Sequence, residues 1–263
     1  MKKLKILLVW VGIVAYIVFA LGFVSGEYKK QVYTTIRVKI IDSLENRFVT
    51  AEDVTEILLD NGEKLLGYPQ HTVNTHELEK LLAEDSFIKS ARLYKTVDGA
   101  LNADIVQRKP ILRIINRTGQ SYYLDREGMI LPLSPNFTSR VPVANGYISE
   151  PFNVGSKRSI FEADVPETKR NEVIYDLYAL ASFIESSNLW RAQITQVYVN
   201  NKYEFELIPR VGAHIILLGD ASNVEMKFRK LEALYRYGLN NNGWNNYEII
   251  NLKYENQVVC TKR

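Results

Sequence analysis

The chain has 263 residues, of which 46% are hydrophobic and 24% charged, a composition typical of a globular protein with room for two modest domains. Its formal net charge of +3 is carried by one end. The first 30 residues hold five lysines and one glutamate, whereas the rest holds 28 basic and 29 acidic residues. A body so nearly neutral lacks the dense basic surface that nucleic-acid binding requires. The single cysteine, Cys260, and three histidines predict no disulfide within the chain and no metal site, and no motif predicts a cofactor.

The first apolar segment predicts a membrane anchor. No charged residue occurs between residues 6 and 26, and Ile6–Val24 would span about 28 Å as a helix, close to the thickness of a bilayer core. Lysines within residues 1–5 precede this run. The positive-inside rule therefore predicts a cytoplasmic tail at 1–5, a single-pass transmembrane helix at 6–26 in the inner (plasma) membrane, and a periplasmic or extracytoplasmic body.

A cleaved signal peptide is the alternative interpretation of the same segment. It would make the mature chain a secreted or periplasmic binding protein. The apolar part of a signal peptide is roughly 7–15 residues long, and this run is longer. The length therefore favours an uncleaved anchor.

Residues 34–109 show the pattern of a β-α-α-β-β module. Apolar residues alternate with polar ones from Ile36 to Ile40, which predicts a strand. Strands at 87–96 and 100–107 flank Asp98-Gly99, a strong turn dipeptide. Two helices lie between the first strand and this hairpin. Their starts are predicted by caps that pair a polar residue with an acidic one three positions later: Thr50 with Asp53, and Asn74 with Glu77.

Residues 110–260 are predicted to form a mixed β domain with two long helices, so the expected fold class is α+β. One helix is expected from Asp164 and the other from Ser222, which is predicted to cap it with Glu225. Asp125–Gly128 is predicted to be a turn in which Gly128 supplies the backbone angle. Glu248–Val259 is predicted to be one long final strand.

One motif raises the question of catalysis. Ser86 and Lys89 match the Ser-x-x-Lys pattern of cell-wall acyltransferases. That chemistry places the serine at a helix start with the lysine one turn later, whereas this segment has the pattern of a strand, in which residues three apart point to opposite faces. We therefore predict no catalytic residue and a protein that is not an enzyme. The acyltransferase remains an alternative.

The order of these features resembles the FtsQ/DivIB family of bacterial cell-division proteins, in which an anchor helix precedes a POTRA domain and a β domain. The resemblance covers nearly the whole chain and rests on short stretches in matching order: Phe87–Leu93, Arg108–Pro110, Tyr123–Gly128, Leu218–Asp220, Glu225–Lys227 and Ile250–Tyr254. It implies a non-enzymatic scaffold of the divisome that links its partners to wall synthesis at the septum.

The resemblance also implies a partner-docking region. The family captures its partners FtsB and FtsL largely through the terminal region, and an exposed strand edge can recruit another strand through its backbone. We therefore expect docking by β-strand addition at the C-terminal edge. The candidate partner-binding residues are Lys202, Ile250, Asn251, Leu252, Lys253, Tyr254, Glu255 and Asn256.

Overall fold

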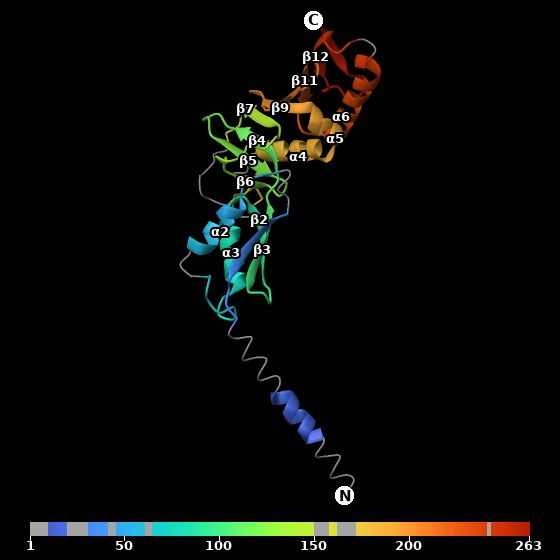
Figure 1. The fold of residues 1–263 in the computed structure, drawn as a ribbon. Coiled ribbons are helices and arrows are strands. Elements are labelled where there is room, and N and C mark those ends of the chain that lie inside the picture. The colour runs from blue at the N-terminus through green and yellow to red at the C-terminus, as the bar shows by residue number, and fades with distance from the viewer. Residues whose placement is uncertain are drawn as a thin grey trace. The chain divides into compact units, whose positions relative to one another are not determined.

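The computed structural model divides the chain into two compact units, Met1–Gln107 and Arg108–Arg263 (Figure 1). The residues that the structure describes are 10–19, 31–41, 46–60, 65–149, 158–161, 172–240 and 243–263.

A helix covers residues 10–19, inside the predicted membrane segment. No helix within the described residues has both the length and the apolar character needed to cross a membrane. The predicted span 6–26 extends on both sides beyond the described helix, and the predicted tail 1–5 lies outside the described residues.

The first unit has the predicted β-α-α-β-β order. Its three strands form a sheet in the order β1-β3-β2, with β1 parallel to β3 and β2 antiparallel to β3. The two helices pack together on one face of this sheet (Figure 1). The elements are β1 (Thr35–Ile40), α2 (Ala51–Asp60), α3 (Thr75–Glu84), β2 (Ile88–Lys95) and β3 (Ala100–Gln107).

Local capping explains where these helices begin. The Asp53 carboxylate accepts a hydrogen bond from the Thr50 backbone N–H at 2.8 Å, and the Thr50 hydroxyl accepts one from the Asp53 N–H at 3.2 Å. This is the predicted capping box. The Asn74 side chain accepts from the His76 N–H at 3.1 Å and caps α3. The predicted hairpin turn is also confirmed, because Gly99 has a φ of 86°.

The second unit combines one large mixed sheet with helices, which confirms the α+β prediction. Its sheet has the strand order β13-β12-β11-β10-β9-β7-β4-β5-β6-β8. The strands are β4 (Pro110–Ile115), β5 (Ser121–Asp125), β6 (Met129–Leu131), β7 (Val143–Gly146), β8 (Arg158–Ser159), β9 (Ile194–Val199), β10 (Phe205–Pro209), β11 (Ile215–Gly219), β12 (Tyr247–Asn251) and β13 (Val259–Lys262). The helices are α4 (Glu172–Ser186), α5 (Asn188–Gln193), α6 (Val224–Ala233) and a π-helical segment, η2 (Leu234–Leu239).

A buried ion pair closes the predicted turn of this unit. One oxygen of Asp125 lies 2.9 Å from the Arg108 guanidinium, and the other accepts hydrogen bonds from the backbone N–H groups of Glu127 and Met129, both at 2.8 Å. Gly128 has a φ of 73°, as the turn requires. Asp125 therefore organises the turn, and its burial is compensated by these three donors.

Two predictions about this unit are wrong, and a third falls on undescribed residues. The segment Glu248–Val259 is not one strand: β12 ends at Asn251, and β13 returns antiparallel beside it. Ser222 does not cap α6, since its hydroxyl donates to Asp220 at 2.6 Å and the cap position, Asn223, makes no side-chain cap hydrogen bond. The predicted helix start at Asp164 lies outside the described residues.

Candidate functional site

Seven of the eight candidate docking residues lie on β12 and on the loop that follows it, and Lys202 lies in the turn between β9 and β10. Ile250 and Leu252 are fully buried and belong to the hydrophobic core. Their side chains are therefore part of the folding core and present no surface to a partner. Lys253, Tyr254, Glu255 and Asn256 are exposed, and the Tyr254 residue keeps 49% of its surface accessible.

β12 is not an edge strand, contrary to the expectation for this segment. It pairs in parallel with β11 on one side and antiparallel with β13 on the other. A partner strand cannot add to β12 while β13 is in place, because both rows of backbone groups are in use. The strand at this end of the sheet is β13, a four-residue strand whose residues are exposed or half-buried.

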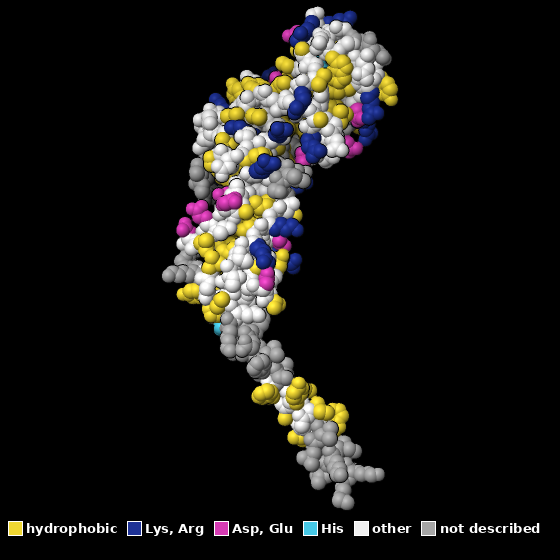
Figure 2. Space-filling model, in the orientation of Figure 1, with side chains coloured by type: hydrophobic (Ala, Val, Ile, Leu, Met, Phe, Trp, Pro, Cys, Tyr) yellow, Lys and Arg dark blue, Asp and Glu magenta, His cyan; other side chains and the backbone are white. Residues whose placement is uncertain are grey.

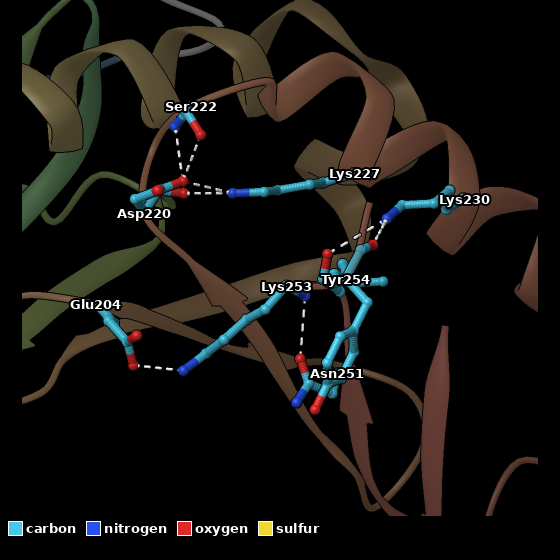
Figure 3. Close-up of polar contacts among 9 residues, drawn as sticks. Glu204, Asp220, Ser222, Lys227, Lys230, Asn251, Lys253 and Tyr254 are labelled. Carbon is cyan, nitrogen blue, oxygen red and sulfur yellow. Dashed lines mark hydrogen bonds and ion pairs between the residues drawn. The ribbon is translucent and has the colours of Figure 1, made fainter. Parts of the chain in front are cut away.

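Lys230 of α6 holds the loop after β12 (Figure 3). Its ammonium donates to the backbone carbonyls of Leu252 at 3.3 Å, Tyr254 at 2.5 Å and Glu255 at 3.2 Å. An ammonium group has three N–H donors, and this one meets three carbonyls of a single loop. These hydrogen bonds hold the loop where the chain leaves β12, and the Tyr254 side chain of this loop is exposed.

A second contact ties the same loop to the hairpin between β9 and β10. The Lys253 ammonium lies 2.5 Å from the Glu204 carboxylate, and this hydrogen bond is the main reason why the pKa of Glu204 is lowered. Lys202, in the turn of that hairpin, also lowers it through its charge. Lys202, 51 positions before Lys253 in the sequence, therefore acts on the same carboxylate through its charge, and among the described residues its only hydrogen bond runs from its backbone N–H to the Asn200 side chain.

Sequence reasoning missed the ion pair that fixes the start of α6. Lys227 is buried, and its ammonium donates to the carboxylate of Asp220 at 2.7 Å and to the Asp220 carbonyl at 2.9 Å (Figure 3). This contact and the Ser222 hydroxyl hold the pKa of Asp220 down at about 2. The signal available in the sequence was an acidic residue seven positions before a lysine on the buried face of a helix.

The arrangement is suited to binding a protein chain. It combines a sheet edge with an exposed aromatic ring. It also contains carboxylate and ammonium groups that the ion pairs and hydrogen bonds described above hold in place. Ser86 lies in a turn before β2, and Lys89 lies in β2, so the Ser-x-x-Lys pair does not have the helical setting that acyltransfer uses. Within the described ranges, no group of three or more His, Cys, Asp or Glu could hold a metal ion.

The fold and the site define a class: an α+β protein in which a POTRA-like module precedes a mixed β domain with a loop and a sheet edge exposed near its C-terminus. Comparison with protein families matches residues 31–106 to the POTRA-like domain and residues 109–261, more than half of the chain, to FtsQ/DivIB, C-terminal related. No curated protein matches the chain. The chain belongs to the FtsQ/DivIB family, a family of non-enzymatic scaffolds of cell division that are typically membrane-anchored.

Proposed function

We propose that this chain is a single-pass scaffold of the bacterial divisome that docks FtsB- and FtsL-type partners and links them to wall synthesis at the septum. Membership of the FtsQ/DivIB family carries the proposal. The anchor is the segment 6–26, with residues 1–5 in the cytoplasm and the two units outside it. The charge excess ahead of the apolar run supports this orientation.

A reporter that is active only outside the cytoplasm, fused after Arg263, tests the orientation. Activity is expected. A well-expressed but silent fusion contradicts the proposed topology. Sequencing of the mature N-terminus distinguishes the anchor from a cleaved signal peptide, because only an uncleaved chain retains Met1 to Lys5.

The docking surface that we propose is the outer edge of β13 together with the loop at Lys253–Asn256 and the hairpin residue Lys202. Asn251, half-buried at the end of β12, lies beside this loop and accepts the Lys253 N–H at 3.0 Å. A partner strand would add to β13, and the Tyr254 ring would anchor it at one end. Ile250 and Leu252 would support this surface from the core.

Backbone directions identify a sharp probe on β13. The Arg263 N–H donates to the Asn246 carbonyl, and amide directions alternate along a regular strand, so the Cys260 N–H points to the outer edge. Cys260→Pro removes this donor, and Cys260→Ala keeps it. Binding of FtsB- and FtsL-type partners, measured by co-purification from membranes, should fall for Cys260→Pro and persist for Cys260→Ala.

Tyr254→Ala tests the same surface without changing the backbone. Loss of about 2 kcal/mol of binding free energy is expected if the ring is a hot spot. Circular dichroism verifies that each variant is folded. Wild-type binding by folded Tyr254→Ala and Cys260→Pro would place the docking site elsewhere, for which the first unit is the next candidate.

A further inference from the structure

His214 is a buried histidine of the second unit that the docking surface proposed above does not use. It lies directly before β11 and keeps 2% of its surface accessible. Its Nε2 lies 3.0 Å from the Tyr235 hydroxyl, and its Nδ1 has no hydrogen-bond partner among the described residues. A buried polar atom without a partner costs stability. Protonation would increase this cost, because the charged ring has two N–H donors to satisfy.

Aromatic rings and one glycine enclose this imidazole. The Tyr235 ring centroid lies 5.7 Å from that of His214 and 4.8 Å from that of Trp244, and both pairs meet edge to face. Gly212 approaches so closely that a Cβ at this position would lie 2.6 Å from the His214 Nδ1. These surroundings are suited to a neutral ring and do not replace the water that a charged ring requires.

Charged groups lie near His214 without pairing with it. The Arg263 guanidinium donates to the carbonyl of Ala213, the residue before His214, at 2.9 Å. Glu248 is exposed, although the β11–β12 register continued by one residue places it beside His214. No carboxylate of the described residues forms an ion pair with this histidine. Figure 2 shows lysine and arginine side chains at the end of the second unit where Figure 1 marks the C-terminus.

Burial therefore decides the ionisation of His214. It lowers the pKa of His214 below the ordinary value of 6.5 and outweighs the opposite effect of the Trp244 backbone. Burial also raises the pKa of Tyr235, the titratable group in contact with the ring, to about 12, so this hydroxyl stays neutral. Arg191 and Arg210 are exposed, and residues 243–246 carry no charge. The neutral imidazole is therefore the favoured form in the closed fold.

Three strands of the sheet have an end at this site. β11 begins directly after His214, β12 begins three residues after Trp244, and β13 ends directly before Arg263. The Arg263 N–H also donates to the Asn246 carbonyl at 3.2 Å. The residues that meet here form what we call the His214 cluster: Gly212, His214, Tyr235, Trp244 and Arg263. The cluster links β13, the outer strand of the proposed docking surface, to the core of the unit.

β13 and Trp244 are the parts of this site that move most readily. Tyr235 keeps 5% of its surface accessible, whereas Trp244 is half-buried and Arg263 is exposed. β13 has four residues and, among the described strands, pairs only with β12. Such a short outer strand opens locally at a lower free energy than the strands of the core. A charged His214 would therefore reach water most easily by displacing Trp244 and β13.

We propose that the His214 cluster is a pH-sensitive latch for the docking edge. At neutral pH the uncharged imidazole packs among Tyr235, Gly212 and Trp244, and β13 stays on the sheet. In acid, His214 takes up a proton and β13 separates from β12. The proposal rests on the docking surface assigned above to β13: a chain whose body lies outside the cytoplasm would then lose its partner when its surroundings become acidic.

The direction and size of the effect follow from proton linkage. With β13 open, His214 meets water and has its ordinary pKa of about 6.5, whereas the closed state binds the proton less readily. The latch is therefore closed above this pH and weakens as the pH falls below it. Between pH 7.5 and pH 5.5 the open population rises by at most about tenfold, because a single proton contributes roughly a factor of ten per pH unit below the pKa of the open state.

Hydrogen exchange of the full chain in zwitterionic detergent micelles tests the latch without a partner. Protection of residues 259–263, relative to unstructured peptides at the same pH, should fall by about three- to tenfold between pH 7.5 and pH 5.5. Protection of the core strand β9 should change less than twofold. In His214→Gln, β13 should also change less than twofold. An equal fall in the variant, or an equal fall in β9, overturns the proposal.

A titration of the wild-type chain does not depend on how the variant folds. The chain has three histidines, so His71→Gln and His76→Gln assign the imidazole signals in an NMR spectrum. The His214 signals should titrate below about pH 6.5, over the range in which β13 loses protection. Loss of protection while His214 remains neutral overturns the proposal.

Partner binding separates a failure of the latch from a failure of the docking surface. Co-purification of partners from membranes at pH 7.5 and pH 5.5 should weaken with acid in the wild type and much less in His214→Gln. If β13 opens with acid and partner binding does not change, the latch stands and the docking surface is wrong. If binding falls equally in both proteins while β13 stays closed, the latch is overturned and the docking surface stands.

Discussion

Lys230 and Tyr254 lie 24 positions apart, and the Lys230 ammonium donates a 2.5 Å hydrogen bond to the Tyr254 carbonyl. The same ammonium also reaches Leu252 and Glu255. A single side chain of α6 therefore binds three carbonyls of the candidate docking loop at the point where the chain leaves β12.

Replacing this lysine should loosen the loop. Lys230→Met keeps the length of the side chain and removes the donors for three carbonyls. We expect a loss of about 1–2 kcal/mol in unfolding free energy, because the site is partly exposed and water replaces some of these bonds. Hydrogen exchange should accelerate at residues 252–256. Arg229→Met is the control, since Arg229 pairs only with Glu225 on the same helix among the described residues; equal exchange in both variants would contradict the role of Lys230.

The buried pair of Asp125 and Arg108 should be far more sensitive than a surface pair. Asp125→Ala leaves the Arg108 guanidinium buried without its main partner and two backbone N–H groups without an acceptor. We expect a loss of about 3–5 kcal/mol. Urea unfolding followed by fluorescence of Trp190 and Trp244 measures it. Glu127→Gln changes the more exposed partner of Arg108 and should cost less than half as much; similar losses would show that Asp125 has no special role.

Gly146 should tolerate no side chain. Its φ is 101°, and a Cβ there would overlap the backbone carbonyl of Val199 on the paired strand β9. Gly146→Ala should destabilise the second unit by about 2–4 kcal/mol, since neither backbone can shift without breaking the sheet. Gly119 has a φ of 83° and no atom near the same position. Gly119→Ala therefore measures the backbone strain alone and should cost about 1 kcal/mol. Comparable melting temperatures for the two variants would exclude the overlap.

Acid should weaken the second unit through His214. This side chain is buried, with its Nε2 3.0 Å from the Tyr235 hydroxyl, and burial lowers the pKa of His214 below its ordinary value of 6.5. The unfolded chain therefore binds a proton more readily than the folded one. The stabilisation is present above pH 6.5 and is lost as the pH falls through 6.5 toward the lower pKa of the folded state. The melting temperature should drop between pH 7.5 and pH 5.5, and less so for His214→Gln. The exposed His76→Gln should behave as wild type; an unchanged pH dependence in His214→Gln would rule out this origin.

The first unit is expected to fold alone. Its sheet, helices and caps are complete within residues 31–107, and Pro110, at the first position of β4, belongs to the next unit. A fragment of residues 31–107 should melt cooperatively, as followed by circular dichroism. A non-cooperative melt would mean that the first unit depends on the second.

Features set by neighbouring residues could be predicted from the sequence. The capping box at Thr50 and Asp53 and the turn at Asp98-Gly99 need only residues a few positions apart, so propensity and pattern determine them. The anchor prediction and the orientation likewise come from local charge and hydropathy, and they remain predictions.

Features set by residues far apart in the sequence were decided by tertiary structure. No glycine or proline marks the end of β12 at Asn251, so the alternating pattern predicted a strand that continued. The chain turns there because Leu252 enters the core while Lys230 binds the carbonyls around it. Ser222 met the pattern of a cap, but Asp220, held by Lys227, takes its hydroxyl instead. The local sequence pattern indicates which strands, turns and caps a segment can form. Only the packed fold decides which hydrogen-bond partner is closer and better shielded from water.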